Sequence, residues 1–514
     1  MCFTNTQQKE GLLMAKGNFW HNLFGTNPNE GIQPKEVIAY SVTGFGQNFI
    51  CTIIGSFLTV FMTDALLFGA VEKGTLFRSM NGAMAVAFLM LFTRIYDALN
   101  DPIMGSIVDR TRTKWGKCRP YLKWMAIPIA VTTVLCFCPF LEPKSKTTFV
   151  VISVLYVIWS MVYTVADVPY WGLSTCMTND TVVRGKVLTF ARLVCTLGAG
   201  IVTVGVPIIT NAITAKFKDA EGNVLPEYIS QNAETLKWTY FICALVLVVV
   251  SIPMFYYGFK NTTERFTSKD APPSLGHNLK LLFKNKQLLL VVLSGILGGA
   301  RTVYTYTGGL YFAKYVLNNE GLFSLITMLI VPGGLVASIL VPWMTKKFTK
   351  KWAYIYVHIL GAVVMFAMYF IGYDAPWKLV VNAVGLVLLG IPQGVNNIIT
   401  YAMIGDTVDY LEWETGERAE GICFAMQTLI NKIGMAVGAF VGVFSYSWAG
   451  INPEATPAIT ADGKQLLWNV LILSGAISMA ATIIPMLFYN ITEKKQQQMV
   501  AEIAERNGAK ESVK

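Results

Sequence analysis

Charged and polar side chains in one apolar segment are spaced so that they could bind a cation. Arg94, Asp97 and Asp101 follow one another at intervals of three and four residues, which places them on one face of a helix. Two carboxylates one turn apart repel each other in a low-dielectric medium, so they need a proton, a cation or a basic partner. Asn100 adds an amide oxygen between them. Such hard oxygen ligands favour Na⁺, Li⁺ or a proton over a transition metal.

The alternative for these charges is a network that only locks helices together. Two acids beside a single basic residue are costly within a membrane span, and ionisable groups in spans usually have a function. We therefore predict that Asp97 and Asp101 bind Na⁺ rather than a transition metal.

A second polar set, Thr164, Asp167 and Trp171, also repeats at intervals of three and four residues. The Thr164 hydroxyl is suited to complete a cation site. An acid next to a tryptophan is suited to a sugar, since the carboxylate accepts hydroxyl hydrogens and the indole stacks on the apolar face of the ring. The alternative for Trp171 is a place in the aromatic belt at the membrane surface.

Three basic residues of other apolar segments are candidates for the site. Lys432 follows Thr428 by one turn, and it could neutralise the acids of the second and fourth segments when no ion is bound, which would couple ion binding to a change of partners. Arg192 lies in the fifth apolar segment. Arg301, in the seventh, either binds an anionic group of the substrate or pairs with an acid of the first half.

The composition indicates an integral membrane protein. Of 514 residues, 54% are hydrophobic and only 14% are charged, whereas soluble domains carry about 25% charged residues. A soluble enzyme, a disordered chain and a disulfide scaffold are thereby excluded. The net charge of +10 comes from Lys and Arg in short loops, which is a topology signal and does not predict a nucleic-acid partner. Nine scattered cysteines and three histidines match neither a disulfide framework nor a zinc spacing, so we expect no cofactor and no enzyme activity.

Twelve apolar segments are each long enough to cross a bilayer as a helix. We expect an all-α membrane protein with these spans: 37–64, 82–107, 121–140, 148–173, 187–213, 238–258, 288–317, 321–344, 352–373, 377–405, 422–449 and 466–489. The loops after even-numbered spans carry about twice as many Lys and Arg as the others, which predicts that they and both termini are cytoplasmic.

The twelve spans divide into two related halves. Met177–Val182 and Met403–Val408 have similar sequences and end the fourth and tenth spans, and Lys-Trp pairs precede the third and the ninth. Two such repeated motifs at equivalent positions indicate a duplicated six-helix unit, as in major facilitator transporters, which bind substrate between the halves. The predicted organisation is a tail (1–36), a first half (37–258), a central loop (259–287), a second half (288–489) and a tail (490–514).

The stretch from Arg94 to Asp109, continued by Arg112 to Pro120, resembles the signature of the glycoside–pentoside–hexuronide:cation symporters, the family of melibiose permease. Segments around Asp167 and Lys432 resemble its fourth and eleventh helices. The resemblance implies a major facilitator fold and uptake of glycosides with Na⁺, Li⁺ or H⁺. By position, it implies a cation site of Asp97, Asn100, Asp101 and Thr164, and sugar contacts from Asp167, Trp171 and Arg192, with Lys432 between the two sites.

One position departs from the family pattern. The Lys-Asp pair of the first helix is replaced by Gln47-Asn48. Asn48 can still bond sugar hydroxyls, but it is neutral. Loss of this negative charge would ease the binding of a uronate, whose carboxylate could face Arg301 and Arg192.

We therefore expect a symporter of the cell inner (plasma) membrane that imports a glycoside or a related sugar such as a hexuronide, and works as a monomer in the lipid bilayer. One alternative is a transporter of an amphiphile such as a lysolipid, which would need an apolar cleft open to the bilayer. Another is a membrane sensor that binds sugar without transporting it.

Overall fold

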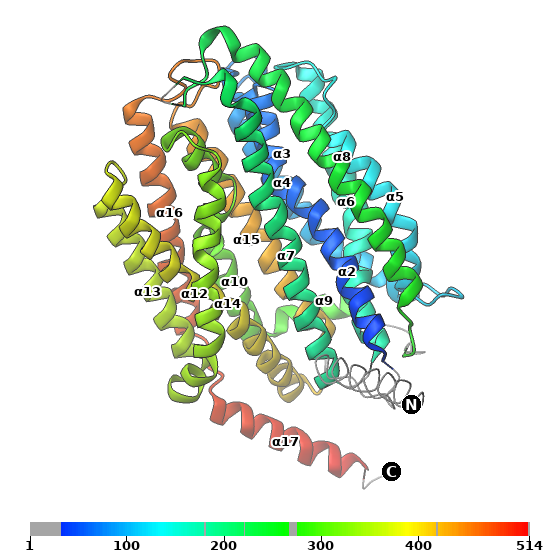
Figure 1. Cartoon of the computed structure of the whole chain (residues 1–514). Coiled ribbons are helices and arrows are strands. Elements are labelled where there is room, and N and C mark those ends of the chain that lie inside the picture. Colours follow the sequence, from blue (N-terminus) through cyan, green and yellow to red (C-terminus); the bar gives the residue numbers. More distant parts are fainter. Residues whose placement is uncertain (1–31, 179–180, 220–221, 267–274, 418–419, 512–514) are drawn as a thin grey trace, which may run out of the picture.

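The computed structural model describes residues 32–178, 181–219, 222–266, 275–417 and 420–511. Within them the chain forms a bundle of long helices, and the only β-structure is two isolated bridges. The helices run roughly side by side between two ends (Figure 1). We call the end where α2 begins and α17 lies the terminal end, and the opposite one the distal end.

Each half of the bundle supplies six spans, and all twelve predicted spans coincide with helical segments. The first half contains α2 (Pro34–Thr52) with η1 (Ile53–Phe57), α3 (Leu58–Val60) and η2 (Phe61–Ala65), then α4 (Gly82–Arg110), α5 (Arg119–Cys136), α6 (Lys146–Met177), α7 (Thr181–Thr214) and α8 (Ile229–Asn261). The second half contains α10 (Lys286–Leu297) with η6 (Gly299–Thr305), α11 (Thr307–Tyr311) and η7 (Phe312–Val316), then α12 (Leu322–Phe348), α13 (Lys350–Ile371), α14 (Pro376–Thr415), α15 (Glu420–Trp448) and α16 (Ala461–Leu487).

Short helices lie outside the spans. They are η3 (Phe68–Ala70), η4 (Ala215–Phe217), η5 (Pro226–Tyr228), α9 (Leu275–Lys284) and α17 (Glu493–Glu511). The predicted central loop thus contains α9, and the predicted C-terminal tail contains α17. Most of the predicted N-terminal tail, residues 267–274 of the central loop and residues 179–180 of the repeated motif lie outside the described residues.

The surface of the bundle is that of a membrane protein. Among the described residues, ten helical segments are long and apolar enough to cross a membrane, and α12, bent by 49°, is an eleventh. The twelfth span, α5, is not among these segments. Its 18 residues include the charged Arg119 and Lys123 near its start. Large apolar side chains face outward, including Phe140, Ile339 and Phe370 at 79%, 78% and 81% exposure. Apolar exposure on this scale requires a lipid environment.

The first and seventh spans are interrupted, whereas the sequence predicts continuous helices. The first contains two π-helical turns, and the seventh contains a 3₁₀ segment followed by a π turn. Glycines explain the break in the seventh span, because a Cβ at Gly309 would lie 1.9 Å from the Tyr304 carbonyl oxygen and one at Gly299 would lie 2.8 Å from Val437. Such interruptions free backbone groups and are common at functional sites.

A buried ion pair joins the two halves at the distal end. Asp64 in η2 is 3% exposed and pairs with Lys314 in η7. The Tyr315 hydroxyl donates to Asp64 Oδ2 at 2.8 Å, and the Tyr446 hydroxyl donates to Oδ1 at 3.4 Å. The carboxylate of the first half is thus held by three side chains of the second half.

The distal end is closed around this pair. A cavity lined by Asp64, Lys314 and residues of both halves has a volume of about 40 Å³, room for a few water molecules and not for a sugar. A second pair across the halves, Lys144 with Glu454, is much more exposed.

Replacing Asp64→Asn should open the distal end, because Lys314 would stay buried without a counter-charge. Breaking a buried pair in this way costs about 3–5 kcal/mol, and each 1.4 kcal/mol corresponds to a factor of about ten in an equilibrium. We expect backbone amides of η2 and η7 to exchange hydrogen at least about tenfold faster, as measured by mass spectrometry.

Two controls separate this effect from general damage. Glu454→Gln breaks the exposed pair and should change exchange little, since such pairs contribute about 0–1 kcal/mol. Adding Lys314→Gln to Asp64→Asn should restore most of the protection, because no charge is then left alone. Equal exchange in Asp64→Asn and Glu454→Gln would show that the buried pair does not hold the end closed.

Candidate functional site

Near the middle of the bundle, α4, α6 and α15 bring the predicted cation ligands together. Asp97 is 2% exposed, and its Oδ1 accepts a hydrogen bond of 2.6 Å from the Thr164 hydroxyl. Lys432 Nζ, from the second half, lies 3.1 Å from Asp97 Oδ2 and donates to Asp101 Oδ1 at 2.6 Å. Arg94 Nη1 lies 4.0 Å from Asp97 Oδ2.

Lys432 therefore contacts both acids of α4, as predicted. No ion pair joins it to Asp167, the acid of the fourth span, among the described residues. The side chains of Lys432, Asp97 and Asp101 are only 10%, 2% and 13% exposed, so neither carboxylate could stay charged here without a cation nearby. Asn100, which lies between the two acids in the sequence, is half-buried. Among the described residues its side chain has no hydrogen-bond partner.

Asp167 is the centre of a second hydrogen-bond cluster. Its Oδ1 accepts from Gln47 Nε2 at 2.6 Å, from Trp171 Nε1 at 3.2 Å and from the Tyr163 hydroxyl at 3.5 Å. The predicted pair of Asp167 and Trp171 is thus in direct contact. Because Trp171 bonds a buried carboxylate, its indole does more than anchor the helix at the membrane surface.

Gln47 is a site residue that the sequence analysis did not select. The prediction for the first helix centred on Asn48, but Asn48 is half-buried and its amide donates to Gly44 O of its own helix at 2.9 Å. Gln47 is 2% exposed, and its Oε1 has no hydrogen-bond partner among the described residues. A buried acceptor without a donor is costly, so a ligand hydroxyl would satisfy Gln47.

Arg192 bridges the two halves beside this cluster. Its guanidinium lies 5.0 Å from the ring centroids of both Trp171 and Tyr401 and donates to the Tyr401 hydroxyl at 2.6 Å. Tyr401 belongs to α14 of the second half and was not predicted. Arg192 and Thr428 are exposed, and Thr428 lies one turn before Lys432 on α15.

Arg301 stands apart from these clusters. It lies in η6, and its Nη1 donates to Gly298 O at 2.8 Å. Arg301 interacts electrostatically with Tyr354, Tyr306 and His358, and no carboxylate of the described residues forms an ion pair with it. The alternative that Arg301 pairs with an acid of the first half therefore finds no support, while a contact with substrate stays a prediction.

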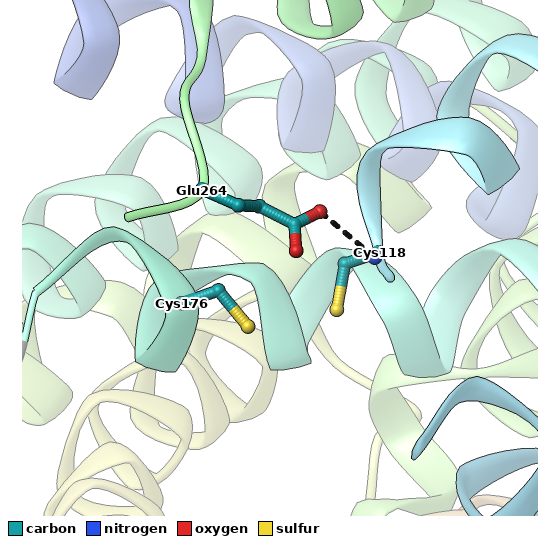
Figure 2. Close-up of side chains that lie close together, drawn as sticks. All are labelled: Cys118, Cys176 and Glu264. Carbon is teal, nitrogen blue, oxygen red and sulfur yellow. Dashed lines mark hydrogen bonds between the residues drawn. The ribbon is translucent and has the colours of Figure 1, made fainter. Parts of the chain in front are cut away.

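A third cluster was missed by the sequence analysis. Cys118, Cys176 and Glu264 offer two sulfurs and a carboxylate oxygen within 4.8 Å of one another, at the terminal end of the first half (Figure 2). The cysteines are 58 residues apart in the sequence, so no local spacing could have revealed them. Only the packing of α5 against α6 brings them together.

An apolar cavity of about 160 Å³ lies among the seventh span, α12, α13, α14 and α16, lined by side chains such as Leu329, Met368 and Leu386. None of the predicted ion or sugar residues is among its lining. The apolar cavity is therefore separate from the predicted ion and sugar residues, and it does not indicate that those residues bind an amphiphile.

Comparisons with known proteins identify the family of this chain. Residues 39–493 match the model of a family described as "MFS/sugar transport protein". The chain is 27% identical to the glucuronide carrier protein homolog of Escherichia coli, covering 93% of this chain and 97% of that protein. It is 26% identical to the isoprimeverose transporter of Lactiplantibacillus pentosus, covering 92% and 91%.

The solved structures confirm the fold. The nucleoside transporter NupG superposes with a TM-score of 0.57 at 14% identity, over 88% of this chain and 100% of that one. The family model covers most of the chain, and the chain belongs to the MFS/sugar transport protein family.

Proposed function

We propose that this protein is a cation-coupled sugar symporter whose two halves rock around a site between them. The observation that carries the proposal is the position of Lys432, whose ammonium holds Asp97 and Asp101 in the absence of an ion. A Na⁺ ion or a proton would compete with Lys432 for the same oxygens. Ion binding would then release a contact between α4 of the first half and α15 of the second.

The ion and sugar sites share one helix, which supports their coupling. Thr164 contacts Asp97 at the ion site, and Asp167, three residues later on α6, carries the sugar-type cluster. A shift of α6 on ion binding would move Asp167 and Trp171 with it. The two ligands would thereby stabilise each other through one rigid element.

For the orientation, we propose that the terminal end faces the cytoplasm. The basic residues Arg110, Arg112, Lys114 and Lys117 precede α5 at that end, as the positive-inside rule requires. The closed distal end would then face outward. The membrane potential would drive the ion inward with about 2.3 kcal/mol per charge at 100 mV.

For the substrate, we propose a glycoside, with hexuronides the first to be tested. Arg301 is a cation that no carboxylate of the described residues neutralises, and Arg192 is exposed beside Trp171. A sugar carboxylate would provide the missing counter-charge. The similarity to a protein named as a glucuronide carrier homolog supports the same choice.

Uptake into energised vesicles tests the proposal. Labelled α-galactosides, β-xylosides and β-glucuronides would be offered with and without a Na⁺ gradient, to the wild type and to Asp97→Asn. We expect Na⁺-driven accumulation of one sugar and its loss in the variant, because the amide removes the charge that attracts the ion. Asp374 forms an ion pair with Lys378 and is largely exposed. The variant Asp374→Asn is the matched control and should transport normally.

The other outcomes discriminate between the alternatives. Accumulation driven only by a pH gradient would make the proton the coupling ion. A neutral glycoside that accumulates while glucuronides neither enter nor compete would refute the hexuronide proposal. Sugar binding without accumulation would indicate a sensor, and no interaction with any sugar by a folded, inserted protein would direct the search to lysolipids.

Replacing Lys432→Gln should separate two steps of transport. Without the ammonium, the protein that carries no ion must keep the two carboxylates buried without Lys432 as a counter-charge while its halves rock, which costs several kcal/mol. The ion-loaded and sugar-loaded protein does not meet this cost. We expect net uptake to fall at least about tenfold, while exchange of labelled for unlabelled sugar at saturating ion keeps most of its rate. Equal loss of uptake and exchange would contradict this role.

A further inference from the structure

The cluster of Cys118, Cys176 and Glu264 lies outside the proposed transport site. Cys118 immediately precedes α5, Cys176 lies at the end of α6, and Glu264 follows α8. Their side chains converge from three separate elements (Figure 2), and both cysteines are only 1% exposed. None of the eight described cysteines is in a disulfide bond, so the sulfurs of Cys118 and Cys176 are available as ligands.

Glu264 is held rigidly beside the thiols. Its Oε1 accepts hydrogen bonds from the backbone nitrogens of Cys118 and Arg119 at 2.8 and 2.7 Å, and its Oε2 accepts one from Lys117 at 2.9 Å. A carboxylate accepts about four hydrogen bonds, so these donors leave one lone pair of Oε2 for a ligand.

The backbone around the cluster is shaped for this carboxylate. A Cβ at Gly116, where φ is +107°, would lie 2.3 Å from the carboxyl carbon of Glu264. The backbone nitrogens of Arg265 and Phe266 donate to Cys176 O at 2.8 and 3.0 Å, which ties the segment after α8 to the end of α6. The three ligand groups are therefore positioned by backbone contacts and not by flexible side chains alone.

We propose that these residues form a binding site for a thiophilic divalent metal ion such as Zn²⁺ or Cd²⁺. Two thiolates and one carboxylate oxygen are a donor set suited to such ions and unsuited to Na⁺ or Mg²⁺. Tetrahedral coordination at Zn–S distances of about 2.3 Å places the sulfurs about 3.8 Å apart. The present spacing of at most 4.8 Å needs only a small contraction. Each thiol releases its proton on binding, and water occupies the fourth position.

A bound metal would cross-link three segments at the terminal end of the first half. It would link the start of α5 and the end of α6 to the segment that leads from α8 toward the second half. The site does not involve Asp97, Lys432 or Asp167, so the proposal stands whether or not the protein couples sugar to an ion.

The test is a titration of the purified full-length protein with Cd²⁺ in a reducing, thiol-free buffer. We expect one saturable site with the ultraviolet charge-transfer absorption of thiolate–cadmium bonds, and competition by Zn²⁺ but not by Mg²⁺. Cys118→Ser and Cys176→Ser should each weaken binding at least a hundredfold. Cys136→Ser, which removes a buried thiol at the other end of α5, should bind as the wild type does.

Glu264→Gln tests the third ligand, and it should weaken Cd²⁺ binding at least tenfold. Because Glu264 also caps α5, the melting temperature of each variant is measured without metal and with Zn²⁺. The wild type and Cys136→Ser should melt at higher temperature with Zn²⁺. The two cysteine variants should not, and Glu264→Gln should show a smaller increase than the wild type. The absence of saturable Cd²⁺ binding by the wild type, or its persistence in both single variants of the cluster's cysteines, would overturn the proposal.

Discussion

The cost of holding charge in an apolar interior constrains the centre of this molecule. Asp97 and Asp101 share one helical turn, and neither could stay ionised there without a positive partner. Arg94 of the same helix lies 4.0 Å from Asp97, and Lys432 of the opposite half contacts both acids. Among the described residues only Lys432 pairs with Asp101, so Asp101 is neutralised while α4 and α15 are in contact. An ion that replaces the ammonium neutralises the same acids without this contact. The electrostatic requirement thus links occupancy of the site to the relation between the halves.

A second buried charge pair lies at another level of the interface between the halves. Asp64 and Lys314 join the halves at the distal end, in the two spans that are interrupted by π turns. When the halves separate at the distal end, Asp64 and Lys314 become hydrated. Breaking this ion pair therefore costs less free energy than it would if both charges stayed buried away from water. The distal pair can therefore open to an aqueous phase, whereas the central pair can part only when another cation takes its place.

The sequence was sufficient to predict contacts that follow helical periodicity or a charge requirement. Lys432 with both acids of α4 belongs to this class. The apolar runs predicted the twelve spans, and the family resemblance placed Thr164 with Asp97. The sequence was insufficient where a partner is neutral or comes from a distant helix. Gln47 and Tyr401 carry no charge, so nothing in an apolar segment marks them, and the breaks in the seventh span depend on how closely Gly299 approaches α15.

The position of Gln47 bears on the charge of the substrate. In this chain the first helix contributes an amide to Asp167, so it adds no acid to the sugar-type cluster. The basic side chains near it, Arg192 over Trp171 and Lys432 on α15, come from both halves. When an ion displaces Lys432 from the acids of α4, that ammonium becomes free to attract another anion. A substrate that carries its own carboxylate would then bind better once the ion is bound, which would couple the two ligands as the proposed symport needs.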